Sequence, residues 1–168
     1  MRTCFVAFAL GAVLATWSSA ACAQRAVFLV RHADRLDESE DSPLSKAGEA
    51  RAQLLASLLK DAGITAIYTT PSAKSSGLFS KTAEPLALAL KIKLVSILNT
   101  DSEGLFKRIR AENRDDIVPI VGTGRTVSAL PKLFGHPVDI TIARTEYDNL
   151  FVLVPKDTGP PTVLRLRY

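Results

Sequence analysis

The stretch VFLVRHADR at residues 27–35 sets the interpretation of the whole chain. Residues 26–30 form a continuous apolar run, the pattern of a β-strand that is buried on both faces of a sheet. Arg31 and His32 follow this run directly. A neutral imidazole is a competent nucleophile near neutral pH, and a guanidinium binds phosphoryl oxygens through paired hydrogen bonds. The pair therefore suits attack on phosphorus, although an Arg-His pair that merely ends a strand at the surface explains these residues equally well.

Beyond this strand, apolar runs alternate with segments of helical spacing. The alternation predicts an α/β fold, a three-layer α/β/α sandwich with a mostly parallel sheet. Residues 150–154 and 162–166 flank Gly159-Pro160-Pro161, which predicts a C-terminal antiparallel hairpin. Ser45 is expected to cap the first helix and Gly63 to stop it. The other predicted strands are residues 64–69, 94–98 and 117–121, and the predicted helices are residues 46–62, 81–90, a segment behind the capping pair Thr100 and Glu103, and about 125–134.

The first 23 residues are predicted to be a cleaved signal peptide. A short basic start precedes an apolar run over residues 5–15, and Ala21-Cys22-Ala23 offers the small residues that signal peptidase accepts. The run is too short for a membrane-spanning helix, which needs ~20 residues. The mature chain is then residues 24–168, a single domain that is exported to the periplasm or secreted. A lipid anchor on Cys22 is the weaker alternative.

Composition restricts the functional classes. Both cysteines, Cys4 and Cys22, lie in the predicted signal peptide, so the mature chain has no disulfide or thiol chemistry. No His, Cys or acidic cluster has metal-ligand spacing, and no cofactor is expected. Residues 24–168 carry 20 Lys and Arg against 17 Asp and Glu, a dispersed excess that weakly favours anionic ligands and does not indicate nucleic acid. The mature chain has no run apolar enough for a membrane helix.

Several motifs resemble, in order and spacing, the histidine phosphatase (phosphoglycerate mutase-like) superfamily, and in particular its small exported bacterial members. The resembling segments are VFLVRHADR, SPLSKAGEARAQLLASLL, IYTTPSAK, KTAEPLA, DIVPIVGTGRTVSAL and YDNLFVLV. The resemblance implies that His32 is transiently phosphorylated and that Arg31 binds the phosphate, without a cofactor. It also implies a phosphorylated small molecule or a phosphoprotein as the partner. Sheets of the predicted kind bind ligands at the carboxyl ends of their strands, where this pair lies.

The sequence departs from the family pattern at two positions. A second arginine normally follows the second strand; counting from Tyr68 puts that position at Lys74, and counting back from Thr82 puts it at Leu78. A lysine can supply a point charge but not the arginine fork, and a solvated loop lysine explains Lys74 as well. A second histidine normally follows a glycine after a later strand, and Thr123 occupies that position.

These departures weaken the predicted phosphate site. Thr123 can donate a hydrogen bond to an oxyanion but carries no charge, and the loss of one such stabiliser costs ~10²–10³ in rate. Arg125, near a predicted helix N-terminus, is a candidate to restore part of the charge, although an exposed arginine in a first helical turn is the simpler interpretation. His136 lies beyond that helix and is expected at the surface. The general acid is not identified; the candidates, each also explained as a solvated or capping residue, are Asp34, Asp101 and Glu103.

Two functional hypotheses follow from the sequence. The chain is either a weak phosphomonoester hydrolase that acts through phospho-His32, or a catalytically inactive pseudophosphatase that binds a phosphorylated or anionic ligand. A third, purely structural or interaction role would need the absence of any affinity for phosphate. Short insertions between the predicted strands leave little cap over the site, which suits a protein phosphohistidine and a small phosphoester equally.

Overall fold

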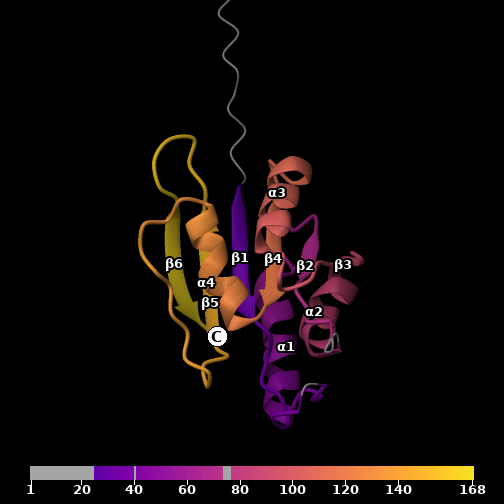
Figure 1. Cartoon of the computed structure of the whole chain (residues 1–168). Coiled ribbons are helices and arrows are strands. Elements are labelled where there is room, and N and C mark those ends of the chain that lie inside the picture. The colour runs from indigo at the N-terminus through magenta and orange to yellow at the C-terminus, as the bar shows by residue number, and fades with distance from the viewer. Residues whose placement is uncertain (1–24, 40, 74–76) are drawn as a thin grey trace, which may run out of the picture.

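The computed structural model describes residues 25–39, 41–73 and 77–168 (Figure 1). The predicted signal peptide and Lys74 lie outside the described residues. One six-stranded sheet has the strand order β3-β2-β4-β1-β5-β6. The strands are β1 (Ala26–Arg31), β2 (Ile67–Thr69), β3 (Leu94–Ser96), β4 (Ile117–Gly122), β5 (Asn149–Val154) and β6 (Thr162–Arg167). The helices are α1 (Lys46–Leu59), α2 (Gly77–Leu90), α3 (Ser102–Glu112) and α4 (Gly124–Leu133).

The pairing of the central strands positions the candidate site. β1 runs parallel to β4, with Arg31 opposite Gly122, and antiparallel to β5, with Val30 opposite Leu150. β5 and β6 pair antiparallel, so the predicted C-terminal hairpin is confirmed. The ends of β1 and β4 and the start of β5 therefore meet at one edge of the sheet, where α4 also begins (Figure 1).

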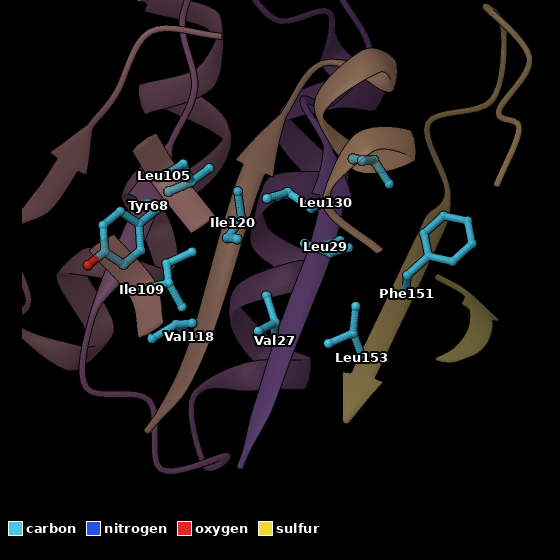
Figure 2. Close-up of a cluster of buried hydrophobic side chains, with 11 residues drawn as sticks. Val27, Leu29, Tyr68, Leu105, Ile109, Val118, Ile120, Leu130, Phe151 and Leu153 are labelled. Atoms are coloured by element: carbon cyan, nitrogen blue, oxygen red, sulfur yellow. The ribbon is translucent and has the colours of Figure 1, made fainter. Parts of the chain in front are cut away.

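The core has two layers, one on each face of the sheet. On one face, Leu105 and Ile109 of α3 and Leu130 of α4 pack against β1, β4 and β5 (Figure 2). On the other face, Leu55 of α1 and Leu86 of α2 pack with residues of the same strands and of β2. The three-layer α/β/α architecture with a mostly parallel sheet is therefore confirmed.

Several predicted boundaries shift. Ser45 caps α1 as predicted, with its Oγ accepting the N–H of Gly48 at 3.1 Å, but α1 ends at Leu59 and the chain turns at Gly63, whose φ is +73°. The strand predicted at residues 64–69 is shorter, because residue 64 contributes only an isolated bridge to β4. No helix in the described parts of the chain is long and apolar enough to cross a membrane.

Two helix starts were predicted wrongly. Asp101, and not Thr100, caps α3, because its carboxylate accepts the N–H of Gly104 at 2.8 Å from one residue closer to the helix. α2 begins at Gly77, four residues before the predicted start, and Pro85 lies inside it. The early turn of α2 forms because it buries Phe79 against the candidate site.

Candidate active site

His32 follows β1 and is held from two sides. Its backbone N–H donates to the carbonyl of Gly122 at 2.8 Å, which extends the β1–β4 pairing by one residue. The next N–H, of Ala33, donates to the hydroxyl of Thr82 on α2 at 3.0 Å. The residue is only 7% exposed. His32 therefore lies at the end of a strand, as the sequence predicts, and it is buried there between β4 and α2.

The His32 ring is neutral and has a defined tautomer. Its Nδ1 lies 3.0 Å from the carbonyl oxygen of Ala33. A carbonyl can only accept, so Nδ1 carries the proton and Nε2 keeps its lone pair. The pKa of His32 is lowered to about 4, mainly by burial and also by the charges of Arg31 and Arg35, while the hydrogen bond to Ala33 acts in the opposite direction. The imidazole therefore has the form that a nucleophile requires across the neutral pH range.

Two aromatic side chains contact the His32 ring. Phe79 on α2 meets it edge-on, with ring centres 5.2 Å apart and planes at 76°. Tyr147, just before β5, lies with its ring centre 5.7 Å from that of His32. Neither residue was singled out from the sequence. The motif YDNLFVLV contains Tyr147 and was the available sequence signal for it. The antiparallel pairing of β5 with β1, which the sequence did not predict, brings the residues before β5 opposite the residues after β1.

Arg31 is engaged with the segment before β5. Its Nη1 donates to the backbone carbonyls of Ala143, Arg144 and Glu146 at 3.2, 2.6 and 3.4 Å. Its guanidinium also lies 4.2 Å from the centre of the Tyr147 ring. Burial lowers the pKa of Arg31, although a guanidinium stays charged at physiological pH. One terminal nitrogen is thus committed to the main chain, while Nη2 makes no hydrogen bond within the described part of the chain.

Thr123 caps α4 and belongs to a line of hydroxyl groups. Its Oγ1 accepts the N–H of Thr126 at 3.1 Å and lies 3.2 Å from the Thr126 hydroxyl. The Thr126 hydroxyl lies 3.1 Å from that of Thr70, at the end of β2. If Thr70 donates to Thr126 and Thr126 to Thr123, the proton of Thr123 is left to donate outward. The sequence indicated Thr123, but not Thr70 or Thr126.

Of the other positions predicted for phosphate ligands, Arg125 and Leu78 are among the described residues. Arg125 is exposed in the first turn of α4, where it lines a cavity of about 840 Å³ together with Arg31 and Thr123. Leu78, the alternative position for a second arginine, is buried in the first turn of α2. The structure therefore brings Arg31, His32 and Thr123 to one edge, with Arg125 beside them.

The predicted acids are mostly committed to structural contacts. The carboxylate of Asp34 pairs with Arg51 at 2.7 Å, and Asp101 is the cap of α3. Glu103 is exposed on α3. His136 is half-buried past the end of α4, which at ~1.5 Å per residue is roughly 15 Å from Thr123. Among the described residues, no group of three or more His, Cys, Asp or Glu is arranged to hold a metal ion.

A mostly parallel α/β sheet with a neutral histidine and an arginine at the end of a central strand defines a class of phosphate-handling proteins. The family model of the histidine phosphatase superfamily (branch 1) matches residues 27–116 of this chain. The chain belongs to that superfamily. The matched segment contains Arg31 and His32 and ends just before β4, so Thr123 lies beyond it. No curated protein sequence matches the chain.

Solved structures share the fold at low identity. The protein histidine phosphatase SixA in complex with tungstate is 18% identical, with a TM-score of 0.63 over 84% of this chain and 96% of that chain. The mycobacterial glucosyl-3-phosphoglycerate phosphatase Rv2419c with inorganic phosphate is 14% identical, with a TM-score of 0.60 over 86% and 96%. Mycobacterial hydrolase 1 is 13% identical, with a TM-score of 0.62 over 86% and 98%. These similarities establish the architecture.

Proposed function

We propose that the protein is a slow phosphomonoester hydrolase that acts through a phosphorylated His32. The supporting observation is the state of this ring: it is buried, its pKa is lowered to about 4, and its Nδ1 proton is held by Ala33. Nε2 is therefore available for attack with no need for a base. The sheet edge where the ring lies is also the edge where folds of this type bind ligands.

The reaction has two displacements. The Nε2 lone pair of His32 attacks phosphorus, the bond to the ester oxygen breaks, and that oxygen leaves with the electron pair. Water then attacks the phosphohistidine, the N–P bond breaks, and inorganic phosphate is released while Nε2 regains its lone pair. Nη2 of Arg31 and the hydroxyl of Thr123 are the groups that stabilise the phosphoryl oxygens.

Turnover is slow because the position of the second family histidine carries no charge. Thr123 contributes a neutral hydroxyl where the family pattern has a histidine, and the substitution of one such stabiliser costs ~10²–10³ in rate. Arg125 supplies a further cation at the start of α4, next to the first N–H groups of that helix. An Arg125→Gln variant with unchanged affinity for inorganic phosphate would exclude this compensation.

The commitment of Asp34 and Asp101 to structural contacts has a consequence for the choice of substrate. Because these two acids are engaged elsewhere, we infer that the ester oxygen leaves as an anion or takes its proton from water. We therefore expect aryl phosphates, whose phenolate leaves readily, to turn over much faster than alkyl phosphates. The exported location predicted from residues 1–23 would place this activity in the periplasm or outside the cell, on a phosphorylated small molecule or a phosphoprotein.

The test is hydrolysis of para-nitrophenyl phosphate by the purified protein and by His32→Asn, with samples denatured in alkali and examined by mass spectrometry for phosphate on His32. Activity and phosphohistidine that are both absent from His32→Asn would support the proposal. Activity that persists in His32→Asn would overturn it, because no other described histidine lies near Arg31.

An inactive phosphate-binding protein is the second candidate, and the engagement of Arg31 favours it. The Nη1 of Arg31 already donates to three carbonyls, so only the remaining N–H groups of its guanidinium can bind a phosphate. In this case inorganic phosphate would bind, para-nitrophenyl phosphate would not turn over, and no phosphohistidine would form. Thr123→His would then make turnover measurable if the charge at this position is what is lacking.

A further inference from the structure

A cavity of about 840 Å³ lies between α4 and residues 139–144, and Arg31, the neighbour of His32, lines it. We call it the α4 groove. Arg31 and Thr123 line it at the catalytic end, and Arg144 lines it from the segment before β5. Cavities of ~300–1,000 Å³ hold small organic ligands, so the groove offers more room than a phosphate alone requires.

The lining of the groove on α4 comes from one face of the helix. Arg125, Ser128, Ala129 and Lys132 stand at positions i, i+3, i+4 and i+7, a spacing that puts side chains on the same side of a helix. At ~1.5 Å per residue, this row runs roughly 10 Å from Arg125 to Lys132. The groove therefore has a wall along α4 with a cation at each end of the row, and Arg31 lines the same groove.

The charge of the groove is strongly positive. Its lining carries four cations, Arg31, Arg125, Lys132 and Arg144, against the single carboxylate of Asp139. Lys132 pairs with Asp139 at 2.5 Å, which offsets one charge. Arg144 lies 3.9 Å from Glu38, but that contact joins two highly exposed side chains and is weak.

We propose that the α4 groove binds a second anionic group of the substrate, so that the substrate is a small phosphomonoester which also carries a carboxylate or a second phosphate. The proposal rests on the proposed function, because it places the reacting phosphate at Arg31 and His32. Arg125 and Arg144 are the specificity residues, since Arg125 has no ion pair within the described residues and the one ion pair of Arg144, with Glu38, is long and highly exposed. The hydroxyls of Ser128 and Thr141 add donors along the path.

The test compares two series of ligands by calorimetry on the purified protein. Carboxyalkyl phosphates of two to six carbons are measured against alkyl phosphates of the same length, so that the two series differ only in the second anion. We expect the carboxylate to tighten binding about tenfold or more at the best length, as one charged hydrogen bond provides. This gain should shrink as the salt concentration rises.

Two double variants isolate the groove. In Arg125→Gln/Arg144→Gln the gain from the carboxylate should fall below about threefold, which is under one charged hydrogen bond. Lys93→Gln/Lys156→Gln is the matched control, because it removes the same charge from two exposed lysines that precede β3 and follow β5, at the opposite edge of the sheet. The control should keep the full gain.

Equal affinity of the two series at every length would overturn the proposal, as would a gain that both double variants keep or both lose. Failure of the proposed function looks different. In that case the wild-type protein forms no phosphohistidine, while the gain from the carboxylate and its loss in Arg125→Gln/Arg144→Gln are still measured.

Discussion

The guanidinium of Arg31 lies 4.2 Å from the centre of the Tyr147 ring, and this contact joins the end of β1 to the segment before β5. The same ring approaches His32, so a single aromatic side chain touches both members of the catalytic pair. The carbonyls that accept hydrogen bonds from Arg31 belong to the turn directly before Tyr147. The orientation of the pair therefore depends on a segment more than a hundred residues away in the chain.

Substitution of Tyr147 tests this dependence. Tyr147→Leu removes the cation–π contact and should lower the free energy of unfolding by about 1–2 kcal/mol relative to Tyr147→Phe, which keeps the ring. Urea unfolding of both variants measures the difference. Phosphate affinity should also fall in Tyr147→Leu alone, because Arg31 loses one of the surfaces that orient it. Equal stability and affinity of the two variants would show that the ring does not hold Arg31.

The stability of the protein should depend on pH through His32. Its pKa is about 4 in the folded chain and 6.5 ordinarily, so between these values the unfolded chain binds a proton that the folded chain does not. Stability is therefore complete above pH 6.5 and falls as the pH drops toward 4, by at most about 1.4 kcal/mol per pH unit. Between pH 7 and pH 5, urea unfolding should show wild type losing about 2 kcal/mol more than His32→Asn. Parallel losses in the two proteins would contradict the lowered pKa.

The junction between β4 and α4 should tolerate a methyl group at one glycine and not at the other. A Cβ at Gly122 would lie 2.7 Å from the Thr70 hydroxyl and 2.9 Å from the Thr126 Cβ, so Gly122→Ala should cost about 1–3 kcal/mol of stability. A Cβ at Gly124 meets nothing within 4 Å, and Gly124→Ala should be neutral or slightly stabilising. Thermal unfolding of the two variants gives the comparison. Similar melting temperatures would show that the junction yields more easily than its contacts suggest.

The line of hydroxyls behind Thr123 should matter for phosphate binding. Thr126→Val removes the hydroxyl between Thr70 and Thr123 and leaves the buried Thr70 hydroxyl without this partner. We expect a loss of about 1–3 kcal/mol in stability and a weaker affinity for inorganic phosphate, whereas Thr126→Ser should retain both. Calorimetric titration with phosphate, next to urea unfolding, separates the two effects. Unchanged affinity in Thr126→Val would mean that Thr123 does not need this orientation.

Local patterns in the sequence were sufficient for the architecture and for the position of Arg31 and His32, the proposed catalytic pair, at the end of a central strand. The apolar run at residues 26–30 predicts a central strand because burial on both faces of a sheet leaves no polar position. The carboxyl end of such a strand is where ligands bind, and this rule together with the resemblance to the family selected Arg31 and His32 as candidates. The helix boundaries were less predictable, as the starts of α2 and α3 illustrate, because a helix start depends on capping and tertiary burial as well as on periodicity.

Contacts between distant segments decided the rest. Arg31 reaches carbonyls that are 112 to 115 residues away, and Thr70 meets Thr126 across 56 residues. Such pairs produce no periodic pattern in the sequence, because each pair forms only when the fold brings two distant segments together. The sequence could therefore point to His32 as the proposed nucleophile. The neutral state of its ring, its aromatic neighbours and the hydrogen bonds of Arg31 to the main chain arise only when burial and packing place Tyr147, Phe79 and the segment before β5 around it.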